Sequence, residues 1–196
     1  MARSDSFALA NSTFEEAEFV IIGVPYDGTT RLRSGTRKAP NAIRKASRIF
    51  DPYLFEHDLD MSSVMVHDAG DLDCGSSCED MFEAVEREAS KVVKAGKFPI
   101  IMGGERSITY PFVKAYRKVG VISIDAHLDF HVQGDRKFDH SCTMRKVADV
   151  VGIENVVPFG VRSISRQELD QVLPNYVDAY QIQEGGVMDS WKKVLN

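Results

Sequence analysis

The sequence predicts an α/β fold, a three-layer α/β/α sandwich around a mainly parallel sheet. Short, continuous apolar runs, typical of parallel strands buried on both faces, alternate with segments of amphipathic helical pattern. Most of these runs end in a polar or glycine-containing loop. In a parallel sheet the carboxyl ends of the strands meet at one edge, where binding sites form. Any functional site is therefore expected at that edge.

The expected strands are the apolar runs at residues 18–24, 64–67, 98–102, 119–125, 154–161 and 177–182. The expected helices lie between them, at residues 40–50, 78–95, 107–118, 140–151 and 165–173. The helix over 78–95 has the clearest pattern, an apolar stripe at spacings of three or four residues formed by Met81, Val85, Ala89 and Val92. No repeat or composition break divides the chain, so a single domain over residues 1–196 is predicted.

Composition and charge narrow the function class. The formal net charge is −5 and no basic tract is present, which argues against nucleic acid as a partner. No apolar run approaches the roughly 20 residues of a membrane span, so no membrane partner is expected. The cysteines Cys74, Cys78 and Cys142 are odd in number and match no zinc-finger spacing. They are interpreted as the free thiols of a cytoplasmic protein.

The run over 119–125 leads into acidic and histidine residues at alternate positions, Asp125, His127 and Asp129. In an extended segment alternate side chains point the same way, so the three are expected to converge. Two carboxylates and an imidazole suit Mn²⁺, Fe²⁺ or Zn²⁺. The structural alternative is that Asp125 caps the strand, Asp129 is solvated and His127 is an ordinary, partly buried histidine. His131 could supply a replacement ligand, or be a surface histidine of the loop.

Several stretches of the sequence resemble one known family. They read VIIGVPYDGTTRLRSGTRKAPNAIRKAS near the start, then GGERSI, DAHLD and FDHSCTMRKV. Together they resemble the ureohydrolase superfamily of arginases and agmatinases, and in detail the agmatinases. The resemblance runs from about Phe19 to Val161 without a large gap, and it implies an arginase-like fold.

The resemblance also implies an activity. Members of the family are binuclear manganese hydrolases that cleave a linear guanidino C–N bond to give urea and an amine. By the resemblance, Asp125 bridges both metals, His127 binds one of them and Asp129 binds the other. His140, in FDHS, corresponds to a histidine near the substrate that assists proton transfer; otherwise it is a polar residue at a helix start. The implied substrate is a small guanidino compound such as agmatine, within polyamine biosynthesis. The implied assembly is a homo-oligomer, a trimer or hexamer.

The sequence departs from the family at two places. The family motif Gly-Gly-(Asp/Glu)-His-Ser supplies a metal-binding histidine, but this chain has Arg106 there, and arginine cannot ligate a cation. The later D-x-D motif, which supplies further ligands, is absent, so the domain is expected to be shortened at its C-terminus. One or no metal is then an alternative to two, and Arg106 could replace an ion beside Asp125 or Asp129. The alternative function is a non-catalytic, degenerate ureohydrolase-like protein that binds a partner subunit, or an incomplete version of an active enzyme.

Overall fold

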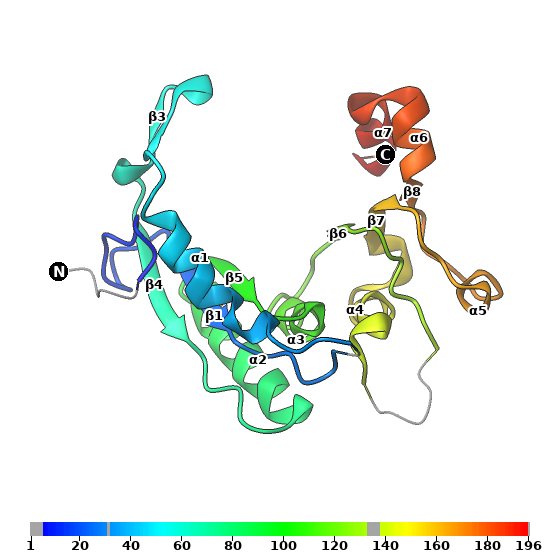
Figure 1. Ribbon diagram of the computed structural model, residues 1–196, viewed down its shortest axis with the longest axis horizontal. Coiled ribbons are helices and arrows are strands. Elements are labelled where there is room, and N and C mark those ends of the chain that lie inside the picture. Colours follow the sequence, from blue (N-terminus) through cyan, green and yellow to red (C-terminus); the bar gives the residue numbers. More distant parts are fainter. Residues whose placement is uncertain (1–5, 31, 133–137, 196) are drawn as a thin grey trace. The chain divides into compact units, whose positions relative to one another are not determined.

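The structure, a computed structural model, describes residues 6–30, 32–132 and 138–195. The chain comprises two compact units, Met1–Ala115 and Tyr116–Asn196. Each unit contains a three-stranded parallel sheet with helices around it (Figure 1). The predicted α/β class with a mainly parallel sheet is therefore confirmed. That the two units form one domain over residues 1–196 stays a prediction.

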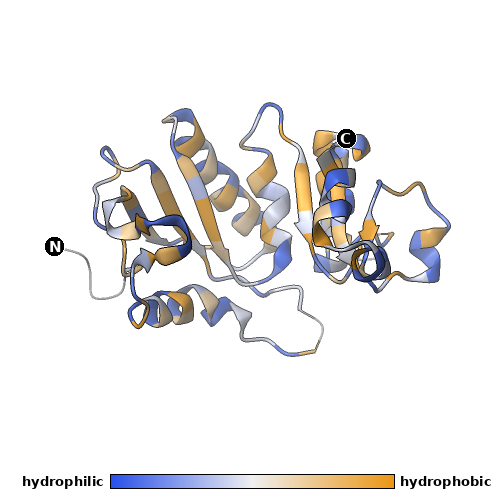
Figure 2. Cartoon of the chain, turned by 90° about the horizontal axis from the view of Figure 1, so that it is seen from above, coloured by the Kyte–Doolittle hydropathy of each residue, from blue (hydrophilic) through white to orange (hydrophobic). Residues whose placement is uncertain are grey.

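The first unit is built on the sheet β4-β1-β5. Its strands are β1 (Phe19–Val24), β4 (Val66–Asp71) and β5 (Phe98–Gly103), and a separate antiparallel pair is formed by β2 (Tyr53–Leu54) and β3 (Leu59–Asp60). Its helices are α1 (Ala39–Ser47), α2 (Cys78–Lys94) and α3 (Thr109–Val113), with 3₁₀ turns η1 (Thr36–Lys38), η2 (Phe55–His57), η3 (Met61–Ser63) and η4 (Arg106–Ile108). Helices α1 and α2 cover opposite faces of the sheet (Figures 1 and 2). The central strand β1 is accordingly apolar on both sides.

Helix α2 forms where the stripe predicts it. Its N-terminus is fixed by a capping box, in which the Asp80 N–H donates to the Ser77 hydroxyl at 3.0 Å and the Ser77 N–H donates to the Asp80 carboxylate at 3.0 Å. The stripe is buried against apolar side chains of β1, and its members, Met81, Val85, Ala89 and Val92, are almost fully inaccessible to solvent. Figure 2 shows the contrast between the largely apolar strands of this sheet and the two-sided helices.

The second unit is built on the sheet β6-β7-β8. Its strands are β6 (Val121–Ile124), β7 (Val156–Val161) and β8 (Val177–Asp178). Its helices are α4 (Thr143–Val151), α5 (Arg166–Leu169), α6 (Ala179–Gly185) and α7 (Val187–Leu195), with 3₁₀ turns η5 (His140–Cys142) and η6 (Ile153–Asn155). Buried apolar side chains of this unit include Leu128, Phe130, Val147, Val156 and Val161. None of the helices in the described part of the chain has the length and apolar character needed to span a bilayer.

The prediction of a strand over 177–182 is wrong beyond Asp178, because α6 begins at Ala179. The Asp178 carboxylate accepts the Gln181 N–H at 2.8 Å, and the Gln181 side chain accepts the Asp178 N–H at 3.1 Å. This capping box starts a helix and outweighs the apolar pattern of a short run.

Two predicted helices are shorter than expected. The helix over 107–118 ends as α3 at Val113, where the Ala115 N–H donates to the Phe112 carbonyl in a closing turn. The helix over 165–173 is only the single turn of α5. The pair β2–β3 and helix α7 were not predicted.

Asp27 is a buried, ion-paired carboxylate in the first unit, and its contribution to stability can be tested. It accepts the Gly35 N–H at 2.6 Å, the Arg37 N–H at 3.3 Å and the Arg37 guanidinium, and its side chain is buried. The hydrogen bond from the Arg37 side chain lowers the pKa of Asp27. A carboxylate whose pKa is lower in the folded state stabilises the fold above its unfolded pKa of about 3.9 and loses that contribution as pH falls through the folded value.

We therefore expect Asp27→Asn to lower the free energy of unfolding at pH 7 by about 1 to 3 kcal/mol, through the loss of hydrogen bonds to a charged group. The difference from the native chain should shrink as the pH falls below about 4. Urea denaturation across pH 2.5–7 measures it, with Glu15→Gln, an exposed carboxylate of the same unit, as the matched control. Equal stability of the native and Asp27→Asn chains at pH 7 would contradict the assignment.

Candidate functional site

The candidate metal-binding segment leaves the carboxyl end of β6. The Asp125 N–H donates to the Phe159 carbonyl of β7 at 3.2 Å, and the Ala126 carbonyl accepts the N–H groups of Arg162 and Ser163, each at 2.9 Å. A parallel bridge joins His127 to Ser163. These bonds carry the β6 backbone past the end of the sheet, beside the residues that follow β7, so that Asp125 and His127 keep the alternation of a strand.

Asp125 and His127 are brought together. The His127 N–H donates to Asp125 Oδ1 at 3.0 Å, and His127 Nδ1 lies 3.3 Å from the same oxygen. Ligand atoms that share one divalent ion, at roughly 2.1 Å from it, lie about 3 Å apart in an octahedron and about 3.4 Å apart in a tetrahedron. The separation of this oxygen and nitrogen fits two neighbouring ligands of one ion. An oxygen and an imidazole nitrogen are also a donor pair suited to manganese and zinc.

Asp129 departs from the geometry expected from alternation. Its φ is 56°, in the left-handed region, so the extended course of the chain ends before it. Its side chain is buried, with only 5% of the residue exposed. Within residues 6–30, 32–132 and 138–195, no three or more His, Cys, Asp or Glu side chains are grouped so that they could hold a metal ion. The structure thus joins two of the three predicted ligands, and the set of three stays a prediction.

His140 begins the 3₁₀ turn η5, capped by Asp139, whose carboxylate accepts the Ser141 N–H at 2.8 Å. His140 Nδ1 lies 3.8 Å from Asp139 Oδ1. The His131 N–H donates to the Ser141 carbonyl at 3.3 Å, which ties the FDHS segment to the segment that carries Asp125 and His127. The two motifs are therefore neighbours within the second unit, although residues 133–137 separate them in sequence.

The cysteines take no part in this arrangement. All three are free thiols, as predicted. Cys142, two residues after His140, is buried, and its thiol lies 2.9 Å from the Asp139 carbonyl oxygen. Burial raises the pKa of Cys142 and of Cys74, the latter to about 11. A thiol held in its protonated form is a poor nucleophile, so cysteine chemistry is disfavoured.

Sequence reasoning missed Glu168, a buried carboxylate beside the candidate metal-binding segment. It lies in α5, and its Oε1 accepts the Phe130 N–H at 2.8 Å. The spacing Ser-x-x-Glu at 165–168 signals a capping box, which the structure contains. That signal predicts the local contact with Ser165 but not the contact with Phe130.

Arg106 and the GGERS motif belong to the first unit. Gly104 is the first residue after β5. Its backbone packs so close to the Tyr26 carbonyl that a Cβ at this position would overlap the carbonyl oxygen. The Glu105 carboxylate is buried and accepts the Thr29 N–H at 2.9 Å, the Thr29 hydroxyl at 2.6 Å and the Ser107 hydroxyl at 2.5 Å. Glu105 therefore organises its own unit. The predicted pairing of Arg106 with Asp125 or Asp129 stays a prediction.

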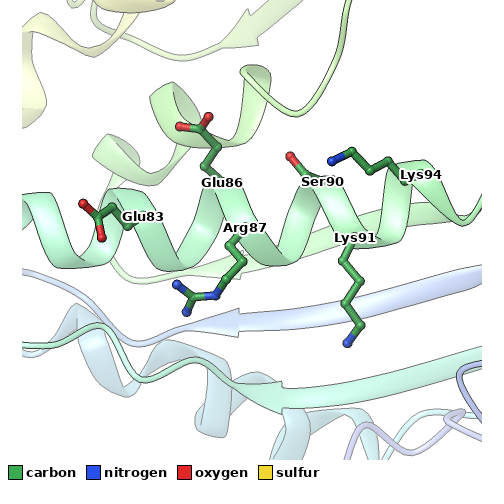
Figure 3. A pocket seen from close by; sticks show the side chains of 6 residues that line it. All are labelled: Glu83, Glu86, Arg87, Ser90, Lys91 and Lys94. Carbon is green, nitrogen blue, oxygen red and sulfur yellow. The ribbon is translucent and has the colours of Figure 1, made fainter.

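A surface hollow runs along α2 in the first unit (Figure 3). It is lined by the side chains of Glu83, Glu86, Arg87, Ser90, Lys91 and Lys94. Both acidic and basic groups line it, the acids in the N-terminal part and the bases in the C-terminal part, and Glu86 pairs with Lys114 at 3.2 Å. Such a lining is typical of a solvated helix face, and none of the predicted site residues contributes to it.

Comparison with known proteins places these observations in a family. A family model described as the arginase family matches residues 17–196. The agmatinase of Pyrococcus horikoshii is 35% identical over 171 residues, which are 85% of this chain and 59% of that protein. The crystal structure of the agmatine ureohydrolase of Thermoplasma volcanium superposes with a TM-score of 0.93 at 30% identity, covering 99% of this chain and 68% of that one.

A crystal structure of Trypanosoma cruzi formiminoglutamase with Mn²⁺ superposes with a TM-score of 0.82 at 25% identity, covering 94% of this chain and 69% of that one. The chain spans less than two thirds of the length of the curated agmatinases that it matches, and 59% in the Pyrococcus case.

Proposed function

Because this chain belongs to the arginase family, we propose that it is an agmatinase-type ureohydrolase, a metal-dependent enzyme that hydrolyses a guanidino compound to urea and an amine. The observation that carries the proposal is the contact between Asp125 Oδ1 and His127 Nδ1 at the end of β6, with the His140 segment beside it. The agmatinase relatives supply the substrate class. The cytoplasmic location, the place in polyamine biosynthesis and the homo-oligomer remain predictions.

Asp125, His127 and Asp129 are the residues that would hold the metal. Asp125 offers a half-buried carboxylate and His127 an exposed imidazole, with 25% and 54% of the two side chains exposed. Both side chains are therefore partly accessible from solvent. A bound divalent ion supplies a Lewis acid and lowers the pKa of water toward neutrality. Manganese is the ion named for the Trypanosoma relative, and we propose it here, as one ion or two.

His140 is the proposed proton-transfer residue. Imidazole is the side chain best suited to acid and base catalysis near neutral pH. The Asp139 carboxylate lies on the Nδ1 side of the ring, and the Thr143 hydroxyl donates to the His140 carbonyl at 2.8 Å. The Thr143 contact holds the backbone at this turn, and the His140 imidazole is proposed to exchange a proton with the substrate amine.

Urea release from agmatine in the presence of Mn²⁺ tests the proposed activity. Arginine serves as the comparison substrate, because it adds a carboxylate to the same guanidino group. Faster release from agmatine supports the agmatinase assignment, and faster release from arginine would replace it with an arginase assignment. His140→Asn should lower kcat for the better substrate by roughly 10²- to 10⁴-fold, the usual contribution of a general acid or base.

Arg106 favours a second candidate, a non-catalytic ureohydrolase-like protein that binds a partner subunit or at most one metal. A permanent guanidinium stands where the family motif supplies a histidine ligand. Elemental analysis of the purified chain separates the candidates. Two equivalents of manganese per chain would exclude replacement of an ion by Arg106, and one or none would favour it.

The variant Arg106→His is expected to raise manganese affinity, because it restores the ligand type of the family motif. A ligand worth about 1.4 kcal/mol would lower the Kd about tenfold. Arg106→Gln is the matched control, since it removes the charge without adding a ligand. An equal gain in both variants, or no gain in Arg106→His, would show by calorimetric titration that ligation is not the cause.

A further inference from the structure

We propose that Glu168 is a positioning residue for the metal-binding segment. Its buried carboxylate fixes the peptide unit between Asp129 and Phe130 and thereby places the Asp129 side chain for the metal. The inference rests on the proposed function, because the placement matters only if this segment binds a metal.

The first support is the burial and bonding of the carboxylate. Only 2% of the Glu168 side chain is exposed. Oε1 accepts the Phe130 N–H at 2.8 Å, Oε2 accepts the Ser165 N–H at 2.7 Å, and His131 Nε2 lies 3.6 Å from Oε2. A buried charge is retained only where donors compensate it, and here both oxygens have donors. One side chain thus connects α5 to the segment that leaves β6.

The second support is the strained backbone beside that contact. Asp129 has a left-handed φ of 56°, a conformation that is uncommon for residues other than glycine, although aspartate adopts it more readily than most. The Asp129 carbonyl accepts the Arg145 N–H of α4 at 3.2 Å, and the next N–H, that of Phe130, donates to Glu168. The same peptide unit is therefore held at both ends, by two different helices. This restraint turns the Asp129 side chain inward, where it is buried.

Glu168 also has a local role, which the test must separate from the proposed one. It is the third residue of α5, and its N–H donates to the Ser165 hydroxyl at 3.3 Å in the capping box. Aspartate serves equally at that position, as Ser77 and Asp80 show in α2. Glu168→Asp should therefore keep the cap, while its carboxylate, one methylene shorter, no longer reaches Phe130. Ser165→Ala does the reverse, since it removes the hydroxyl of the cap and leaves the Glu168 carboxylate in place.

The experiment is calorimetric titration of the full chain and both variants with MnCl₂, with thermal unfolding of each in the absence of metal. Glu168→Asp is expected to weaken manganese binding roughly tenfold or more, as residues that orient metal ligands typically do. Ser165→Ala is expected to keep the native affinity. Native affinity in Ser165→Ala, which lacks the cap hydroxyl, together with a loss in Glu168→Asp, which keeps the cap, supports positioning.

Equal affinity in the native and Glu168→Asp chains would overturn the inference and leave the proposed function intact. An equal loss in Ser165→Ala and Glu168→Asp would also overturn it, because capping alone would then explain the effect. A native chain that binds no manganese would overturn the proposed function and this inference with it. If Glu168→Asp does not fold, Glu168→Gln, which keeps the length but only one accepting oxygen, is judged by the same outcomes.

Discussion

Asp125→Asn is expected to weaken manganese binding by more than about a hundredfold and to abolish urea release. Residues that only orient metal ligands account for about ten- to a hundredfold in affinity, and a ligand itself should account for more. The amide is neutral and keeps one oxygen, so it preserves size and most hydrogen bonding. In the structure this residue also accepts the His127 N–H, and the amide oxygen can still do so. The loss should therefore reflect the missing charge rather than a collapsed loop.

Calorimetric titration and a urea assay on the same preparation measure this effect. The matched control is Asp149→Asn in α4, an exposed acid of the same unit that pairs with Lys146 at 3.4 Å. The control should bind manganese as the native chain does. Native affinity in Asp125→Asn would show that the β6 segment is not the metal site.

Arg44→Leu is expected to lower the free energy of unfolding by about 3 to 5 kcal/mol, the usual cost of leaving a buried charge without its partner. Arg44 in α1 is only 4% exposed and donates to both oxygens of Asp68, each at 2.8 Å, and to Asp71. Both acids belong to β4, so the guanidinium fastens α1 to the sheet of the first unit. The Asp68 side chain is 1% exposed, so the variant leaves a buried carboxylate without its cationic partner.

Guanidinium chloride denaturation measures the change. Lys45→Leu, on the exposed side of the same helix, is the matched control and should lie within about 0.5 kcal/mol of the native chain. A loss below about 1 kcal/mol in Arg44→Leu would contradict the account of the ion pair. The Arg44–Asp68 pair lies in the first unit, whereas the candidate metal residues lie in the second. The effect of Arg44→Leu on stability is therefore independent of metal binding.

The elements that could be predicted from sequence are those whose signals are local. The stripe of α2 acts within one helix and is confirmed, and the structure adds the Ser77–Asp80 cap at its start. The alternation of Asp125 and His127 holds for the same reason, since the β6 backbone stays extended through His127. At residues 177–182 two local signals compete, and the cap at Asp178 prevails over the apolar run.

What the sequence could not predict depends on contacts between distant residues. Alternation placed Asp129 with its neighbours, but its backbone is turned by bonds to α4 and to Glu168, 38 residues on from Phe130. The Ser-x-x-Glu pattern predicts the hydrogen bond that Glu168 Oε2 accepts from Ser165, but it does not predict the hydrogen bond that Oε1 accepts from Phe130. Long-range hydrogen bonds of this kind have no signature in spacing, although they fix the backbone of the candidate ligand Asp129.

The most direct test of the central claim is urea release from agmatine by the complete chain, with manganese added to millimolar concentration. Urea and the corresponding diamine are expected in equal amounts, increasing with time and with enzyme concentration, and neither is expected from Asp125→Asn. A folded chain that binds manganese and yet releases no urea from agmatine or arginine would contradict this claim, and would favour the non-catalytic candidate instead.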